Sequence, residues 1–139
     1  MLMNKLIILR GNSGSGKTTI AKELQRKMGS NTLLISQDVI RREMLMVKDG
    51  PDTMALPMLK ELLIYGRNHC ETVILEGILV GEWYRSLFEQ AKELGFVCLA
   101  EGAENRIQID RLRELGCEII QGYYYSKPIP LGEYEEKYL

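Results

Sequence analysis

The chain has no excess of charge of either sign and no long apolar run. Its 139 residues carry a formal net charge of −1 at pH 7. This balance argues against a nucleic acid as the main partner, because binding to a polyanion needs a basic excess that releases counterions. No apolar stretch reaches the about 20 residues of a membrane span, and Met1–Asn4 lack the flanks of a secretory signal. We therefore expect a cytoplasmic protein that does not enter a membrane.

Cysteine and histidine are too sparse to build a metal-binding cluster. The three cysteines, Cys70, Cys98 and Cys117, show no metal-ligand spacing, and their odd number does not suggest a disulfide framework. Cys98 and Cys117 fall in strand-like runs, so buried, reduced thiols are expected. His69, the one histidine, falls between a predicted helix and a predicted strand and is interpreted as a turn residue.

The composition, 45% apolar and 27% charged, is typical of one globular domain over residues 1–139. Short apolar runs alternate with helix-like segments, a pattern that predicts an α/β fold: a doubly wound, five-stranded parallel sheet covered by helices on both faces in three layers. The predicted strands are 6–9, 32–35, 71–75, 96–99 and 117–120, and the predicted helices are 18–28, 39–47, 54–65, 82–94 and 105–115.

A glycine-rich loop joins the first predicted strand to the first predicted helix. Glycines let the backbone turn tightly so that several N–H groups point into one concavity, and the helix dipole adds to its attraction for anions. Lys17 can reach the β- and γ-phosphates of a nucleotide, and the Thr18 hydroxyl can bind Mg²⁺. A chance glycine run would lack this strand and helix, so we predict a Walker A loop that binds ATP, another nucleoside triphosphate, or inorganic phosphate or sulfate. Its residues are Gly11, Asn12, Ser13, Gly14, Ser15, Gly16, Lys17, Thr18 and Thr19.

Two acidic residues follow predicted strands. The carboxyl ends of parallel strands meet at one edge of the sheet, where α/β proteins bind ligands. Glu76 is therefore expected to hold Mg²⁺ through water together with Thr18, the alternative being a solvent-facing acid. Asp38 precedes a helix, where aspartate is a favoured N-cap. The adjacent Arg41 and Arg42 are either ligands of an anionic acceptor or a solvated helix edge.

Residues 1–92 resemble a small P-loop kinase that phosphorylates nucleosides or metabolites. The glycine-rich loop, Ile35–Arg42 and Val73–Gly77 carry this resemblance. It implies a P-loop NTPase-like sheet with strand order 2-3-1-4-5, and ATP with Mg²⁺ as cofactors. It also implies catalytic roles for Lys17 and for Asp38, the latter as the base that orients an acceptor hydroxyl for in-line transfer.

The last third of the chain carries motifs of a different kind. They are Ala100–Glu104, Leu112–Cys117, Gln121–Tyr123 and Ser126–Pro130. With these motifs, residues 93–139 are very similar to the C-terminal strand–helix–strand unit of EAL-domain phosphodiesterases, TIM-barrel enzymes that hydrolyse cyclic di-GMP. Two positions depart from the pattern, Ala103 from the usual valine and Asn105 from the usual threonine.

The EAL resemblance does not imply EAL activity. In that family the positions of Glu101 and Gln121 line the catalytic metal site, but the Glu-Ala-Leu strand, the paired aspartates and the catalytic lysine of the full barrel are absent. A hydrolytic metal site needs several converging ligands, so the chain is not expected to hydrolyse cyclic di-GMP. The EAL-like part also stands where a kinase would present its arginine-bearing lid.

We therefore interpret the chain as a chimera, engineered or natural, that keeps a phosphate-binding loop and has little or no catalysis. The alternatives are a small-molecule kinase that uses ATP and Mg²⁺, and a structural scaffold without a ligand. Glu101 is expected near the active-site edge, where its charge would repel phosphate. The tyrosine-rich tail Gly122–Leu139 is expected to wrap the sheet edge or an adjoining helix and to support homo-oligomer formation.

Overall fold

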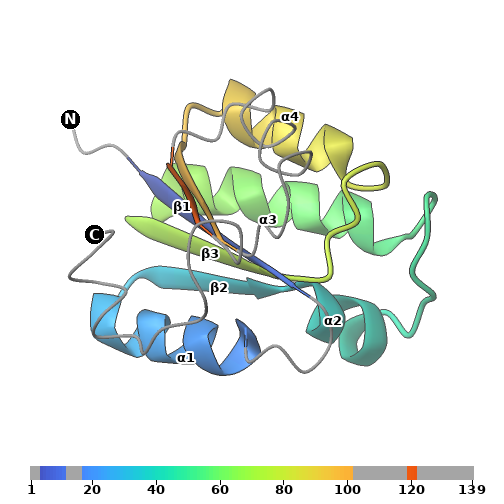
Figure 1. The fold of residues 1–139 in the computed structure, drawn as a ribbon, viewed down its shortest axis with the longest axis horizontal. Helices are drawn as coiled ribbons and strands as arrows, with labels where there is room; N and C mark the ends of the chain where they lie inside the picture. The colour runs from blue at the N-terminus through green and yellow to red at the C-terminus, as the bar shows by residue number, and fades with distance from the viewer. Residues whose placement is uncertain (1–3, 12–16, 102–118, 122–139) are drawn as a thin grey trace.

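The computed structural model describes residues 4–11, 17–101 and 119–121, the last five residues of the second range and all of the third by their backbone only. Strands and helices alternate along these ranges (Figure 1). The elements are β1 (Lys5–Arg10), α1 (Lys17–Met28), β2 (Thr32–Ser36), α2 (Gln37–Val39), the π-helical turn η1 (Ile40–Met44), α3 (Ala55–His69), β3 (Thr72–Gly77), α4 (Arg85–Glu93), β4 (Val97–Glu101) and β5 (Ile119–Gln121).

The strands form a five-stranded sheet in the order β2-β3-β1-β4-β5, in which every pairing is parallel. Helix α1 covers one face of the sheet, and α3 and α4 cover the other (Figure 1). The predicted architecture, three layers around a sheet of order 2-3-1-4-5, is therefore confirmed. The connections from β1 to β2, from β2 to β3 and from β3 to β4 each contain a helix, as parallel pairing requires.

The central strand β1 faces the core on both sides of the sheet. Ile7 and Leu9 pack with Ala21 and Leu24 of α1, whereas the alternate residues of β1 belong to the cluster formed with α3 and α4. Side chains of a strand alternate between faces, so an unbroken apolar run is what a strand covered on both sides needs.

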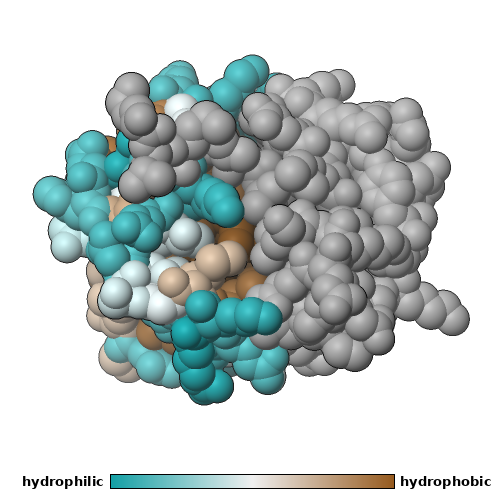
Figure 2. Space-filling model, turned by 90° about the vertical axis from the view of Figure 1, so that its left-hand side faces the viewer, coloured by the Kyte–Doolittle hydropathy of each residue, from teal (hydrophilic) through white to brown (hydrophobic). Residues whose placement is uncertain are grey.

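On the face shown in Figure 2, most of the coloured surface is hydrophilic and apolar side chains gather in a hollow near its centre.

The segment after β2 differs from the single helix predicted over residues 39–47. Helix α2 begins two residues earlier because the Ser36 hydroxyl caps it, accepting a hydrogen bond from the Val39 N–H at 3.4 Å. The chain then widens into η1, where the Leu45 N–H donates to the Ile40 carbonyl at 2.9 Å. Met46 adopts a positive φ of 54°, which ends the helical path and starts the loop 45–54.

Helix α3 runs past Tyr65, where the sequence placed its end, to His69. His69 is therefore a residue of the last helical turn and not of the connecting turn, which corrects the interpretation from the sequence. Pro57 lies in the first turn of α3, where its missing N–H is one that no helix would use. The predicted helix 105–115, the tail 122–139 and Cys117 lie outside the described residues.

Gly66 of α3 allows the helix to approach the sheet. A Cβ at this position would lie 2.5 Å from Val73 Cγ2 and 3.1 Å from Leu33 Cδ2. We expect Gly66→Ala to destabilise the protein by about 1–2 kcal/mol, because overpacking costs about 1–3 kcal/mol and outweighs the about 1 kcal/mol by which alanine favours a helix. Urea unfolding measures the difference, with Asn68→Ala on the exposed face as the control. An increase in stability for Gly66→Ala would contradict this packing.

Candidate functional site

The carboxyl ends of three strands and the start of α1 meet at one edge of the sheet. The register pairs Leu9 of β1 with Glu76 of β3, and Glu76 with Ser36 of β2. Gly11 follows β1 directly, and α1 begins at Lys17. The flanking strand and helix of the predicted phosphate-binding loop are thus present, while Asn12, Ser13, Gly14, Ser15 and Gly16 lie outside the described residues. Lys17 is half-buried, and Thr18 and Thr19 are exposed in the first turn of α1.

Glu76 is the buried acid of this edge, with a relative exposure of 1%. Its Oε1 accepts hydrogen bonds from the Ser36 hydroxyl at 2.6 Å and from the Thr18 hydroxyl at 3.3 Å. Its Oε2 is also buried and has no hydrogen-bond partner within the described part of the chain. A buried polar atom without a partner is costly and rare in native proteins, so Oε2 is placed to take a ligand. Glu76 is therefore not the solvent-facing acid that the sequence left as an alternative.

The oxygen atoms around Glu76 suit Mg²⁺. The Thr18 hydroxyl donates its hydrogen to Glu76. The lone pairs of the threonine oxygen therefore point away from the carboxylate. The described ranges contain no group of three or more histidine, cysteine, aspartate or glutamate residues that would form a dedicated metal cage. Mg²⁺ is commonly bound by one or two protein oxygens while keeping water and phosphate as its other ligands, and this donor set fits that pattern.

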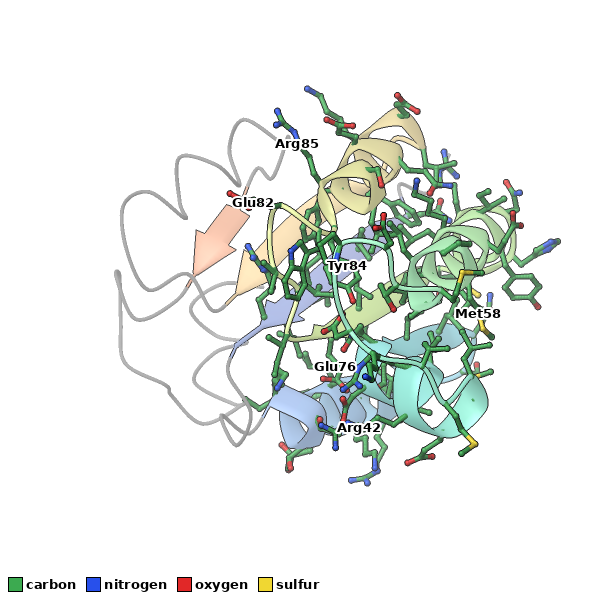
Figure 3. The ribbon with its side chains drawn as sticks, turned by 90° about the vertical axis from the view of Figure 1, so that its right-hand side faces the viewer. Arg42, Met58, Glu76, Glu82, Tyr84 and Arg85 are labelled. Atoms are coloured by element: carbon green, nitrogen blue, oxygen red, sulfur yellow. The ribbon has the colours of Figure 1, made fainter. Side chains whose placement is uncertain are left out.

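Asp38 lies on α2, exposed, beside this edge. Its Oδ1 pairs with Arg41 Nη2 at 2.8 Å and with Arg42 Nε at 3.0 Å, and the Arg41 side chain is 16% exposed against 67% for Arg42. Ser36, and not Asp38, caps the helix, so the N-cap interpretation of Asp38 is wrong. Arg41 is partly enclosed rather than part of a solvated edge, and Arg42 points outward near the site in Figure 3.

Sequence reasoning missed a group of hydrogen-bonded polar side chains, of which Gln37 and Tyr84 are buried and Asp49 is half-buried. Gln37 Nε2 donates to the Tyr84 hydroxyl oxygen at 2.8 Å and to Asp49 Oδ2 at 3.2 Å. The Tyr84 hydroxyl donates to Asp49 Oδ1 at 2.6 Å. Burial, followed by the hydrogen bond to Asp49, raises the pKa of Tyr84 well above its usual value, so the hydroxyl stays a donor. The spacing of these residues in the sequence gives no sign of the contact. Gly50 and Pro51, which follow Asp49, indicate only that this segment is irregular.

The last residues of β4 and β5 reach the same edge of the sheet. The register aligns Leu9 with Glu101, and Glu101 with Gln121. The expected position of Glu101 at this edge of the sheet is confirmed for its backbone. Among the cysteines, Cys70 is a buried free thiol whose pKa is raised by burial. In the part of the chain that the structure describes, every helix is too short or too polar to cross a bilayer.

The sequence matches the EAL domain family over residues 74–128. The cyclic di-GMP phosphodiesterase NbdA of Pseudomonas aeruginosa is 40% identical over 52 residues, which make up 37% of this chain and 7% of that protein. The cyclic di-GMP phosphodiesterase RocR of the same organism is 44% identical over 45 residues, 32% of this chain and 12% of that protein. The chain thus spans 12% or less of the length of these relatives.

The three-dimensional structure is similar to solved kinases. A cysteine-to-alanine mutant of the APS kinase CysC from Mycobacterium tuberculosis superimposes with a TM-score of 0.57 at 15% identity, covering 99% of this chain and 95% of the kinase. A gluconokinase from Sinorhizobium meliloti gives a TM-score of 0.54 at 17% identity, covering 96% of this chain and 88% of that protein. At such low identity the likeness concerns the fold alone.

The chain therefore combines a kinase-like fold with an EAL-like sequence segment, as its motifs predicted. The matched EAL range overlaps residues 74–92, which we assigned to the kinase-like part. Both kinds of protein build parallel strands joined by helices with a right-handed crossover, so β3 and α4 suit either. The boundary between residues 92 and 93 remains our proposal.

Proposed function

We propose that the chain is a chimera, engineered or natural, that binds the phosphate groups of ATP or another nucleoside triphosphate together with Mg²⁺. Inorganic phosphate or sulfate would bind at the same place. The observation that carries this proposal is the buried Glu76 carboxylate, whose Oε1 is held by Ser36 and Thr18 while Oε2 has no partner in the described ranges. The similarity in fold to kinases supports it.

Each residue of the site has a defined task in this proposal. The backbone N–H groups of Gly11–Thr19 surround the phosphates, and Lys17 neutralises their charge. Thr18 and Glu76 hold the metal, Glu76 through a water molecule. When bound, Mg²⁺ neutralises and orients the β- and γ-phosphate oxygens.

We expect little or no phosphoryl transfer. Such transfer depends on charge neutralisation, and a supplied arginine contributes about 10³–10⁵ in rate. The lid that supplies it in small P-loop kinases is replaced in our assignment by the EAL-like residues 93–139. Asp38, the proposed base, is engaged with Arg41 and Arg42. The EAL-like part supplies Glu101 and Gln121 but not the other ligands of a hydrolytic centre, so we also expect no cyclic di-GMP hydrolysis.

Binding is tested by thermal unfolding in the presence of ATP and MgCl₂. A ligand that binds only the folded state at 100 times its Kd stabilises it by about 2.7 kcal/mol, which would raise the melting temperature by about 5–10 °C in a chain of this size. An unchanged melting temperature with ATP, phosphate and sulfate would contradict the proposal and favour a scaffold without a ligand.

A small-molecule kinase is the second candidate, favoured by the cluster of Asp38, Arg41 and Arg42 beside the site. ATP turnover with a panel of hydroxyl-bearing anionic acceptors tests it. In a kinase, Lys17→Ala and Asp38→Asn would each lower turnover by about 10²-fold or more, whereas activity equal to the wild type in Lys17→Ala would eliminate this function.

The proposal also covers the tail Gly122–Leu139 and the cellular location of the protein. We propose a cytoplasmic protein without a nucleic-acid or membrane partner, in which the tyrosines of the tail promote a homo-oligomer. Light scattering of the full chain and of a chain ending at Gln121 compares their masses. The same number of chains per particle in both would contradict the role given to the tail.

A further inference from the structure

Gln37, Asp49 and Tyr84, here called the buried triad, form a closed ring of hydrogen bonds. Gln37 is 1% exposed and Tyr84 is 0% exposed, whereas Asp49 is half-buried. The two Gln37 bonds use its amide nitrogen, at 2.8 Å to Tyr84 and 3.2 Å to Asp49, and the Tyr84 hydroxyl completes the ring at 2.6 Å to Asp49. The triad joins α2, the loop 45–54 and the start of α4, segments that are distant along the chain.

The buried triad touches the backbone that carries the site. Gln37 lies between Ser36, which holds the Glu76 carboxylate, and Asp38. On β3, Gly77 follows Glu76, and a Cβ added at Gly77 would lie 2.8 Å from the Cβ of Gln37. Gln37 therefore packs closely against the residue next to Glu76. Figure 3 shows Tyr84 and Glu76 both within the fold.

Packing alone does not explain polar groups at this position. Burying the Tyr84 hydroxyl and the Gln37 amide, and half-burying the Asp49 carboxylate, costs free energy that apolar side chains would not cost, and apolar packing is not directional. Hydrogen bonds fix distance and direction together, and fully satisfied polar networks make a buried region rigid and unique. Such a hydrogen-bonded network is useful where neighbouring side chains, here Ser36 and Glu76, must keep one geometry.

We propose that Gln37, Asp49 and Tyr84 are positioning residues that hold β2 and β3 so that Ser36 and Glu76 present an unpartnered carboxylate oxygen to a divalent cation bound with phosphate. This inference rests on the proposed function, since it concerns the same metal site. The described contacts of the triad lead to the backbone that carries Ser36 and Glu76, so we place its effect on the metal-dependent part of binding and not on the affinity for the phosphates themselves.

The test compares ATP affinity with and without Mg²⁺ in wild type and in Tyr84→Phe. The phenylalanine keeps the ring in its buried place and removes only the hydroxyl. We expect Tyr84→Phe to reduce the gain in affinity that Mg²⁺ provides by about tenfold, the scale of losses when groups that orient metal ligands are removed, with the metal-free Kd unchanged. Tyr65→Phe, on an exposed tyrosine of α3, is the matched control and should change neither value.

A Mg²⁺-dependent gain that Tyr84→Phe leaves intact would overturn the inference while the proposed function stands. If the wild type itself binds no ATP, the proposed function fails, and hydrogen exchange then decides the positioning role alone. Tyr84→Phe should speed exchange of the amides at 36–39 and 48–50 and leave those of α1 unchanged, whereas unchanged exchange at 36–39 overturns the inference. Asp49→Asn, which leaves one acceptor oxygen for the two donors Gln37 and Tyr84, repeats the test should Tyr84→Phe fail to fold.

Discussion

Replacing Glu76 by glutamine is expected to stabilise the ligand-free protein and to remove the effect of Mg²⁺ on ATP binding. The carboxylate is 1% exposed, and its Oε2 has no hydrogen-bond partner within the described residues. Burying a carboxylate in this state costs more than burying the neutral amide of the same shape. The amide oxygen can still accept from Ser36 and Thr18. We expect a gain of about 1–2 kcal/mol in the free energy of unfolding, and a loss of about 10–100-fold in metal affinity.

Opposite effects on stability and on binding are what distinguish a ligand site from ordinary packing. Melting temperatures without ligand measure the first effect, and competition with a fluorescent ATP analogue at several Mg²⁺ concentrations measures the second. Glu71→Gln serves as the control because Glu71 is exposed just before the same strand. A destabilised Glu76→Gln protein with an unchanged Mg²⁺ dependence would show that the carboxylate serves the fold and not a metal.

Replacing Lys17 by alanine is expected to weaken ATP binding by about 10–100-fold. The residue opens α1 directly after the glycine-rich loop, where its ammonium group can reach the phosphates. A hydrogen bond to a charged group contributes about 1.5–3 kcal/mol, and each 1.4 kcal/mol corresponds to a factor of about ten in affinity. The loss should appear with and without Mg²⁺, unlike that of Glu76→Gln.

Lys22→Ala provides the comparison for Lys17, because Lys22 lies on the exposed side of the same helix. It removes the same charge at a greater distance from the loop, and should change the Kd for ATP less than twofold at physiological salt, where exposed charges are largely screened. Equal losses for the two variants would mean that ATP is held by general electrostatic attraction and not by the loop.

Much of the fold follows from the pattern of the sequence. Apolar runs such as that of β1 can be buried on both faces only in a covered parallel sheet, and Gly95 ends α4 with a φ of +77°, as a helix terminator does. The position of Glu76 beside Thr18 could also be predicted, because strand ends and helix starts meet at one edge in this topology. These features can be predicted because they depend on the local sequence and because a parallel sheet of this kind allows few ways of connecting its strands.

The other features depend on contacts between distant segments, which local patterns do not specify. The sequence suggested Asp38 as the cap of α2, but the cap is Ser36, which the register brings beside Glu76. The closeness of Gln37, Asp49 and Tyr84 arises from the path of the loop 45–54 past α4. The widened turn η1 likewise depends on where that loop must go.

Calorimetric titration of the wild-type protein with ATP, with and without Mg²⁺, tests most directly whether this sheet edge binds a metal-bound polyphosphate. We predict saturable binding of one ATP per chain, and an affinity about tenfold or more higher with Mg²⁺ than with EDTA. The absence of heat at any concentration, or one affinity in both conditions, would contradict the account.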